Sequence, residues 1–209
     1  MQELFGGEIK IINIIIIIKV PLLGNNENNV NKLKGNNGGD GLVCARHLKL
    51  FGYNVTICYP KRTDKEIYKR LLNQCVEMDI EVIKNYEGIS AEDIRKNYAL
   101  VVDALFGFGF RGPLRAPFDS IIKELTDSKV KLCSIDVPSG WNIDSEEGSV
   151  GNESLIQPTM LISLTAPKLC SKNFKNCHYL AGRFLPPKLE KDFNLNLPCT
   201  PPGKLFMKI

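Results

Sequence analysis

From residue 41 onward, apolar residues occur in two kinds of run, either spaced by three or four positions or continuous over four to eight. The spaced runs are typical of helices, and the continuous runs are typical of strands buried on both faces. The predicted helices are 41–51, 65–78 (with Ile67, Leu71, Leu72 and Cys75 on one face), 91–97 and 118–125. The predicted strands are 54–59, 80–83, 99–106, 130–137, 160–165 and, last, 178–185. This alternation predicts an α/β fold, a three-layer αβα sandwich around a Rossmann-like, mostly parallel sheet.

The first 34 residues break this pattern and form an atypical N-terminal segment, ahead of a domain that spans 35–209. Ile11–Val20 is nearly pure isoleucine, which predicts a buried strand or else an aggregation-prone segment. Residues 21–34 carry five asparagines and are expected to form a mobile loop. The segment has neither the cleavage site of a signal peptide nor the Arg- and Ser-rich pattern of a transit peptide.

The composition supports a single folded domain, because 44% of the 209 residues are hydrophobic. The net charge of +4 is mild and the basic residues are scattered, which argues against nucleic-acid binding. No apolar stretch reaches the roughly 20 residues that span a bilayer, so no membrane span is expected. The seven cysteines form no C-x-x-C pair, and Cys170, Cys177 and His178 lack a zinc-binding spacing. We therefore expect buried or free thiols in a reducing compartment.

The glycine-rich stretch Gly35–Gly41 lies directly before a predicted helix. Glycines allow positive φ angles and let a ligand approach the backbone closely. N–H groups at a helix N-terminus bind anions, and Asp40 is expected to cap that terminus. The stretch therefore predicts a phosphate- or nucleotide-binding loop, the alternative being a turn that only connects two elements.

A second glycine-rich segment, Gly107–Gly112, follows the strand 99–106. It matches G-x-G-x-x-G, and Asp136 comes 24 residues after its last glycine, as in a dinucleotide fingerprint. Pro113 and Pro117 delay the next helix, however, so the glycines do not open it. We interpret the segment as a loop that encloses a ligand.

Two acids, Asp103 and Asp136, occur at or near strand ends. Because Asp103 lies in an apolar run, its carboxylate needs a paired charge, hydrogen bonds or a cation, and it could be a purely structural acid that caps a loop. Asp136 lies three residues before Ser139 and could likewise be a turn cap. Strand-terminal acids beside glycine-rich loops indicate general acid–base or cation chemistry, with the roles of the two acids left open. His47 and His178 are interpreted as packing or surface residues.

Several separate motifs closely resemble the NAD(P)HX epimerase family, whose animal members are also called apolipoprotein A-I-binding protein. They occur in the family's order and cover roughly residues 35 to 198. The motifs are GNNGGDGLVCARHL (35–48), LVVDALFGF (100–108), SIDVPSGW (134–141), LISLTAPK (161–168) and GRFLPP (182–187).

The resemblance implies an epimerase that interconverts the R and S forms of hydrated NADH and NADPH at C6 of the nicotinamide ring. A partner, the NAD(P)HX dehydratase, accepts only the S form. In the implied reaction the ring nitrogen expels the C6 hydroxyl, and water adds to the other face of the planar iminium. An acid, a base and nearby negative charge would promote this reaction, and we assign Asp136 to that chemistry.

The family's motifs also imply a set of binding residues. The nucleotide would be held by Asn36, Asn37, Gly38, Gly39 and Asp40, by Gly107, Phe108, Gly109, Phe110, Arg111, Gly112 and Pro113, and by Asp136. One potassium ion per subunit would be held by Asn37, Asp103 and Ser139. Oxygen ligands of this kind suit a hard cation.

The chain departs from the family pattern in two places. Pro113 stands where animal members have an acid, and it offers no backbone N–H. Lys34 replaces the proline before the glycine-rich stretch, and residues 6–34 are interpreted as translated non-coding sequence or a lineage-specific insertion, from an imperfect gene model or a splice form. The isoleucine run could replace the family's central strand, followed by a loop about 14 residues too long.

Two other functions stay open. One is a protein-binding module without catalysis, with apolipoprotein A-I as a partner, and the other is an NAD-dependent oxidoreductase. Intact Asn37, Asp103, Asp136 and Ser139 favour the epimerase over the first, and no hydride-transfer acid–base set supports the second. Family members are typically homodimers, and a mitochondrial, cytoplasmic or secreted location is expected.

Overall fold

The computed structural model describes residues 14–18, 37–60, 65–83, 89–110, 113–148, 155–182, 185–197 and 203–209, with the backbone alone for 14–18 and Asn37. The strands are β1 Ile14–Ile18, β2 Val55–Cys58, β3 Glu81–Ile83, β4 Leu100–Ala104, β5 Lys131–Ile135, β6 Met160–Leu164, β7 Cys177–Ala181 and β8 Phe206–Lys208. In the described chain they form one eight-stranded sheet in the order β3-β2-β1-β4-β5-β6-β7-β8. All neighbours are parallel except β7 and β8, which pair antiparallel.

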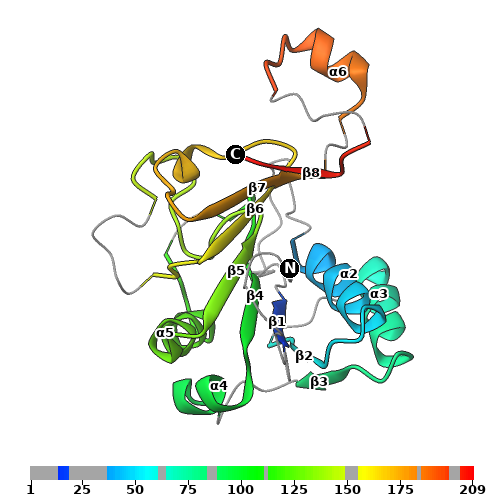
Figure 1. Cartoon of the computed structure of the whole chain (residues 1–209), viewed down its shortest axis with the longest axis vertical. Coiled ribbons are helices and arrows are strands. Elements are labelled where there is room, and N and C mark those ends of the chain that lie inside the picture. Colours follow the sequence, from blue (N-terminus) through cyan, green and yellow to red (C-terminus); the bar gives the residue numbers. More distant parts are fainter. Residues whose placement is uncertain are drawn as a thin grey trace, which may run out of the picture.

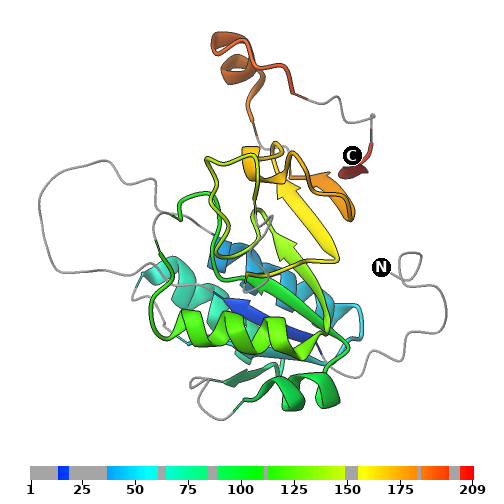
Figure 2. The same ribbon diagram turned by 90° about the vertical axis from the view of Figure 1, so that its left-hand side faces the viewer.

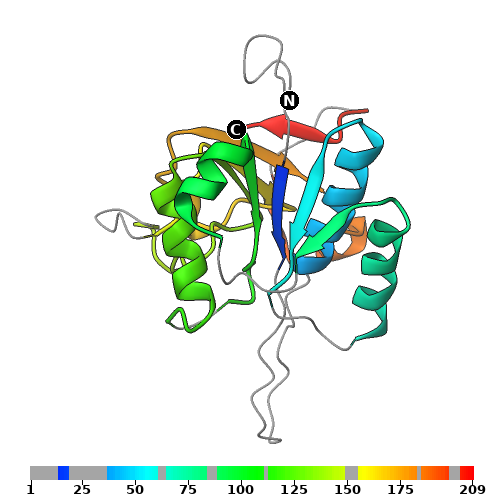
Figure 3. The same cartoon turned by 90° about the horizontal axis from the view of Figure 1, so that it is seen from below.

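Helices cover both faces of the sheet. They are α2 Asn37–Leu50, α3 Glu66–Val76, α4 Ala91–Asn97, α5 Phe118–Ser128 and α6 Pro187–Asp192, with a short 3₁₀ turn, η1, at Leu169–Ser171. Helices α2 and α3 lie on one face and α4 and α5 on the other, whereas α6 stands apart from the layers (Figures 1, 2 and 3). The predicted three-layer αβα sandwich with a mostly parallel sheet is confirmed.

The apolar strands are continuous in sequence because each face of the sheet has its own core. On β4, Leu100 and Val102 pack in the cluster beneath α2 and α3, and Val101 packs in the cluster beneath α4 and α5. Successive side chains of a strand point to opposite faces, so a strand covered on both sides needs apolar residues at odd and even positions alike.

The isoleucine run supplies the central strand of the sheet. Residues Ile14–Ile18 pair with β2 on one side and β4 on the other. The strand predicted for this run is therefore present over five residues, and the predicted loop 21–34 lies outside the described residues. From β1 the chain fills one side of the sheet with β2 and β3, then crosses to β4 on the other side. This reversal creates the switch point beside which such sheets bind ligands.

The glycine-rich stretch is helical where the structure describes it, so the prediction of a loop is wrong for residues 37–41. Helix α2 begins at Asn37, and Asp40 lies in its first turn instead of capping it. Of the described glycines with positive φ, none belongs to this stretch. A Cβ on Gly39 would lie 3.2 Å from Cε1 of Tyr68 on α3, so this glycine permits close packing of the two helices.

The remaining differences from the predicted elements concern helix faces and the C-terminal region. On α3 the buried residues are Tyr68, Leu72 and Cys75, whereas Ile67 is 63% exposed. Ile67 therefore does not share the burial of Leu72 and Cys75, with which the sequence pattern groups it on one face. The sequence pattern also missed η1, α6 and β8. The structure shows no buried residue in α6, so no apolar stripe marks this helix in the sequence.

The described helices and cysteines agree with the sequence-based expectations. Of the helices that the structure describes, none combines the length and the apolar character needed to cross a bilayer. The six described cysteines are free thiols, as expected, and Cys199 lies outside the described residues. Burial raises the pKa of Cys44 to about 11 and that of Cys58 to about 12, so both thiols stay protonated at neutral pH.

Two substitutions on α3 test which of its faces carries stability. Leu72 is 9% exposed, and Leu72→Ala should lower the free energy of unfolding by about 2–4 kcal/mol through lost burial and a cavity. Ile67→Ala on the exposed face should change it by less than about 0.5 kcal/mol. Urea unfolding with unchanged m-values measures both. An equal loss in the two variants would contradict the observed orientation of α3.

Candidate functional site

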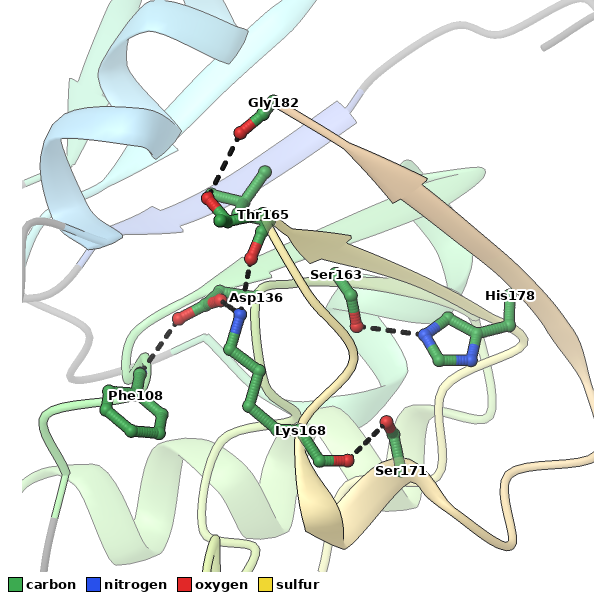
Figure 4. Close-up of polar contacts among 9 residues, drawn as sticks. Phe108, Asp136, Ser163, Thr165, Lys168, Ser171, His178 and Gly182 are labelled. Carbon is green, nitrogen blue, oxygen red and sulfur yellow. Dashed lines mark hydrogen bonds and ion pairs between the residues drawn. The ribbon is translucent and has the colours of Figure 1, made fainter. Parts of the chain in front are cut away.

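The carboxyl ends of the parallel strands gather the polar residues that the sequence singled out. The N-terminus of α2, which follows β1 in the chain, the loop 105–110 after β4 and the loop 136–141 after β5 all lie at this edge. The segment 165–168 after β6 joins them there (Figure 4). Ligands of open α/β sheets bind at this edge, which makes it the candidate site.

Asp103, inside β4, is fully buried and receives four hydrogen bonds. Oδ1 accepts from the backbone N of Leu105 (3.2 Å) and from Oγ of Ser139 (2.6 Å). Oδ2 accepts from Oγ of Ser134 (2.8 Å) and from the backbone N of Ser139 (2.9 Å). Burial raises the pKa of Asp103 above its ordinary value, and these hydrogen bonds offset only part of the rise. The carboxylate thus joins the loop after β4 to the loop after β5.

These bonds also test the predicted potassium site. The structure brings Asp103 and Ser139 together, and it does not describe the side chain of Asn37. A carboxylate has about four lone-pair sites, and four donors fill those of Asp103. Oγ of Ser139 also accepts from the backbone N of Phe106 (2.9 Å). The described oxygens suit potassium in kind but are satisfied without it, so the burial of Asp103 requires no ion.

Asp136, directly after β5, is held differently. Its Oδ2 accepts from the backbone N of Phe108 (2.8 Å), and its Oδ1 forms an ion pair with Nζ of Lys168 (Figure 4). The side chain is 13% exposed, so it can be reached from solvent. Among the described residues these two partners occupy about half of the lone-pair sites of Asp136, whereas four donors occupy those of Asp103.

Lys168 was not predicted as a site residue. Its Nζ pairs with Asp136 and also donates to the carbonyl oxygen of Leu164 (2.6 Å), and its side chain is 12% exposed. The signal was available, because Lys168 lies four residues beyond the end of β6, at the sheet edge that holds Asp136. It was overlooked because a single lysine in a loop carries no pattern of its own.

Asp40 lies in the first turn of α2, at the edge of the sheet that holds Asp136. Its side chain reaches solvent, yet the protein around it, and second the negative charge of Asp136, raise its pKa to about 6. Asp40 in turn adds to the effect of burial in raising the pKa of Tyr68 on α3. The structure therefore sets two carboxylates close enough to interact, one of them tied to a lysine and the other able to titrate near neutral pH.

The other predicted binding residues of the loop after β4 differ in how far they are exposed to solvent. Gly107 is buried, and Phe108 is 48% exposed beside Asp136. Phe110 is half-buried, with its ring centroid 4.3 Å from that of Phe106, and Gly109 and Pro113 are exposed. Asn36, Arg111 and Gly112 lie outside the described residues.

The fingerprint interpretation of Gly107–Gly112 does not fit the fold. Helix α5 begins at Phe118, six residues beyond Gly112, so the glycines do not open it. A dinucleotide fingerprint places its phosphate on the N-terminus of the helix that follows the glycines. The structure therefore supports the alternative interpretation, a loop at the site edge.

The two histidines have structural roles. The Nε2 atom of His178 shares a hydrogen bond of 2.9 Å with Oγ of Ser163, inside the protein. Burial, and second the charge of Lys168, lower the pKa of His178, so its ring is neutral at pH 7. His47 is exposed on α2, with its ring 6.3 Å from that of Phe51. Of the two alternatives that the sequence left open, packing applies to His178 and a surface position to His47.

Comparison with known proteins gives a consistent family signal. Residues 33–170 match the family model described as "YjeF-related protein N-terminus". The crystal structure of the yeast protein ynu0, YNL200c, matches all of this chain and 84% of its own, with 34% sequence identity and a TM-score of 0.79. The bulky-bulky ketone specific alcohol dehydrogenase from Comamonas testosteroni matches 61% of this chain and 57% of its own at 12% identity, and its TM-score of 0.32 supports no conclusion.

The interaction between the two carboxylates can be tested by titration. With Asp136→Asn the midpoint of Asp40 should fall below 6, because a like charge that disfavours ionisation is lost, while burial keeps it above the ordinary 3.8. Because the folded protein holds the Asp40 proton more tightly than the unfolded chain, the contribution of Asp40 to stability decreases as pH rises from about 4 to above 6. Carboxyl NMR measures the midpoint. Asp119→Asn on α5 is the control, and an unchanged midpoint in Asp136→Asn would refute the interaction.

Proposed function

This chain belongs to the family of the YjeF-related protein N-terminus, which includes the NAD(P)HX epimerases, and we propose that it interconverts the R and S hydrates of NADH and NADPH. The observation that carries the proposal is the contrast between the two acids. Asp103 is buried and accepts four hydrogen bonds, whereas Asp136 has two partners among the described residues, faces solvent in part, and interacts with Asp40. Only the second arrangement can exchange protons with a ligand.

The proposed reaction breaks and re-forms one C–O bond at C6. A carboxylic acid gives its proton to the departing hydroxyl, which leaves as water while the ring nitrogen supplies the electrons. Water then attacks the other face of the iminium, and a carboxylate takes up the proton that this water loses. Protons and electrons balance over the cycle, so the reaction needs no redox cofactor.

Asp40 and Asp136 suit these two proton transfers. With a pKa of about 6, Asp40 is present in both protonation states near neutral pH, which favours a group that must give and take a proton. Asp136, fixed by Phe108 and Lys168, would lie near the iminium as a stabilising negative charge and as the second proton carrier. The two carboxyl groups would exchange acid and base roles between the R-to-S and S-to-R directions.

Lys168 would set the orientation of Asp136 and contact the ligand. Two of its ammonium protons are used, by Asp136 and by the Leu164 carbonyl, so in the described structure a third remains for an oxygen of the substrate. The S product would pass to a dehydratase that accepts only that form. A homodimeric state, as expected for the family, is part of the same proposal.

The direct test is to supply the R hydrate and follow the appearance of the S hydrate by chromatography, above the rate in buffer. Asp136→Asn should lower the rate by about 10²–10⁴-fold, the usual contribution of a general acid or base. Asparagine is the suitable replacement because Asp136 has a φ of 70°, which asparagine tolerates better than alanine does.

Asp119→Asn on the exposed start of α5 is the matched control and should keep the wild-type rate. Circular dichroism and urea unfolding check that both variants are folded. A folded wild-type protein without activity would overturn the proposed function, and a folded Asp136→Asn variant at the wild-type rate would overturn the role of Asp136.

We propose potassium binding separately, as the family resemblance implies. If the ion binds at Asn37, Asp103 and Ser139, exchanging potassium for choline at constant ionic strength should lower the Tm of the wild-type protein. The Tm of Ser139→Ala should not respond to the exchange, because one oxygen ligand is missing. Thr159→Val, altered at the opposite end of β6, should respond like the wild type. A wild-type Tm that is the same in both salts would exclude a stabilising potassium site.

A further inference from the structure

Two adjacent strands of the sheet end in the same unusual turn. After β5, Asp136 has a φ of 70° and the backbone N of Val137 donates to the carbonyl of Ile135 (2.9 Å). After β6, Thr165 has a φ of 68° and the N of Ala166 donates to the carbonyl of Leu164 (2.8 Å). A hydrogen bond across one residue of positive φ defines the rarer, strained form of the γ-turn.

Thr165 is the less expected of the two central residues. Aspartate visits the left-handed region fairly readily, but a β-branched residue there is an outlier that the surrounding structure must hold in place. Strained backbone of this kind concentrates at functional sites. Thr165 therefore calls for an explanation both of what holds it and of what its conformation achieves.

Strand β7 holds the turn. The backbone N of Thr165 donates to the carbonyl of Ala181 (2.9 Å), and its Oγ1 donates to the carbonyl of Gly182 (3.1 Å; Figure 4). The first bond continues the sheet ladder, which any residue except proline could do. The second requires a hydroxyl side chain at position 165. Threonine is thus sterically unfavourable at this position of the turn, yet its hydroxyl donates the bond to Gly182 that holds the turn in place.

The turn directs one carbonyl group into the candidate site. The oxygen of Leu164 accepts from the N of Ala166 and also from Nζ of Lys168 (2.6 Å), and the same Nζ pairs with Asp136. At its backbone, Lys168 accepts at its carbonyl from both Oγ (2.7 Å) and N (2.9 Å) of Ser171. The ammonium group of Lys168 therefore contacts the turn after β6 through the Leu164 carbonyl and the turn after β5 through the Asp136 carboxylate.

The geometry points to Thr165 as a positioning residue: its hydroxyl bond to Gly182 holds the β6 turn, the turn presents the Leu164 carbonyl to Lys168, and Lys168 orients the carboxylate of Asp136. Its effect on catalysis rests on the proposed epimerase function. Its effect on the placement of Asp136 does not, because the titration of Asp40 reports the distance of that negative charge independently of any reaction.

The test compares three variants. Thr165→Val keeps the shape and removes the hydroxyl, Thr165→Ser keeps the hydroxyl, and Thr159→Val is the matched control. Thr159 makes the same kind of bond, from its Oγ1 to the carbonyl of Leu132 (2.9 Å). It precedes β6, whereas Thr165 follows it, so Thr159 lies at the end of the strand opposite to the site. Each is measured for kcat and KM with the R hydrate, and for the Asp40 midpoint by carboxyl NMR.

Thr165→Val should lower kcat by about tenfold, the value of one hydrogen bond, with KM within about twofold. Its Asp40 midpoint should fall from about 6 toward that of Asp136→Asn, because the charge of Asp136 is no longer held nearby. Thr165→Ser should restore both values, and Thr159→Val should change neither. A wild-type midpoint in Thr165→Val, or equal damage in Thr165→Ser, would overturn the inference.

Thr165→Gly covers the case in which valine prevents folding. Glycine adopts positive φ without strain and lacks the hydroxyl, so it should fold and still show the lowered Asp40 midpoint. A wild-type midpoint in this variant would overturn the inference. If the wild-type protein has no epimerase activity, the proposed function fails, and the midpoints alone decide whether Thr165 positions Asp136.

Discussion

The hydrogen bonds to the buried carboxylate of Asp103 are the constraint on which the candidate site depends. They come from Ser134 on β5, from Ser139 beyond it, and from Leu105 directly after β4. An unpaired carboxylate at this depth would be strongly unfavourable, so the loops that supply the donors are held in one arrangement. Asp136 is three residues before Ser139 and Phe108 is three after Leu105, and their contact across the two loops follows from this arrangement.

The same edge of the sheet contains two residues in unfavourable backbone conformations. Asp136 and Thr165 both have positive φ, and both are held by bonds from neighbouring strands: Asp136 by its N to the Ile162 carbonyl (2.8 Å) and Thr165 by Ala181 and Gly182. Parallel strands with buried faces supply the rigidity for such turns. The free energy gained by burying the two apolar cores thus offsets the cost of a few unfavourable backbone conformations. These conformations place the carboxylate of Asp136 and the ammonium group of Lys168 in contact.

Much of the fold was predictable, because its cause is local or periodic. The alternation of strands and helices, the middle of the isoleucine strand and the sites of Asp103 and Asp136 at strand ends all follow from side-chain patterns. The errors have physical reasons. The stretch after Asn37 is helical, and its Gly39 serves the close packing of α2 against Tyr68 instead of a positive φ angle in a loop. Ile67 is exposed because the helix phase is set by Tyr68, Leu72 and Cys75 together.

The sequence by itself determined the α/β class, the motifs that identify the family, and the place of Asp136 at the end of a strand, since each depends on which residues follow one another. Only the tertiary structure decided that the described residues give Asp103 four hydrogen-bond donors and Asp136 two partners. It also decided that the charge of Asp136 acts on Asp40, that Lys168 pairs with Asp136, and that Thr165 lies at the same edge of the sheet. These properties depend on distances between residues of different strands and loops. No pattern along one segment can specify such distances, because the packing of the sheet sets them.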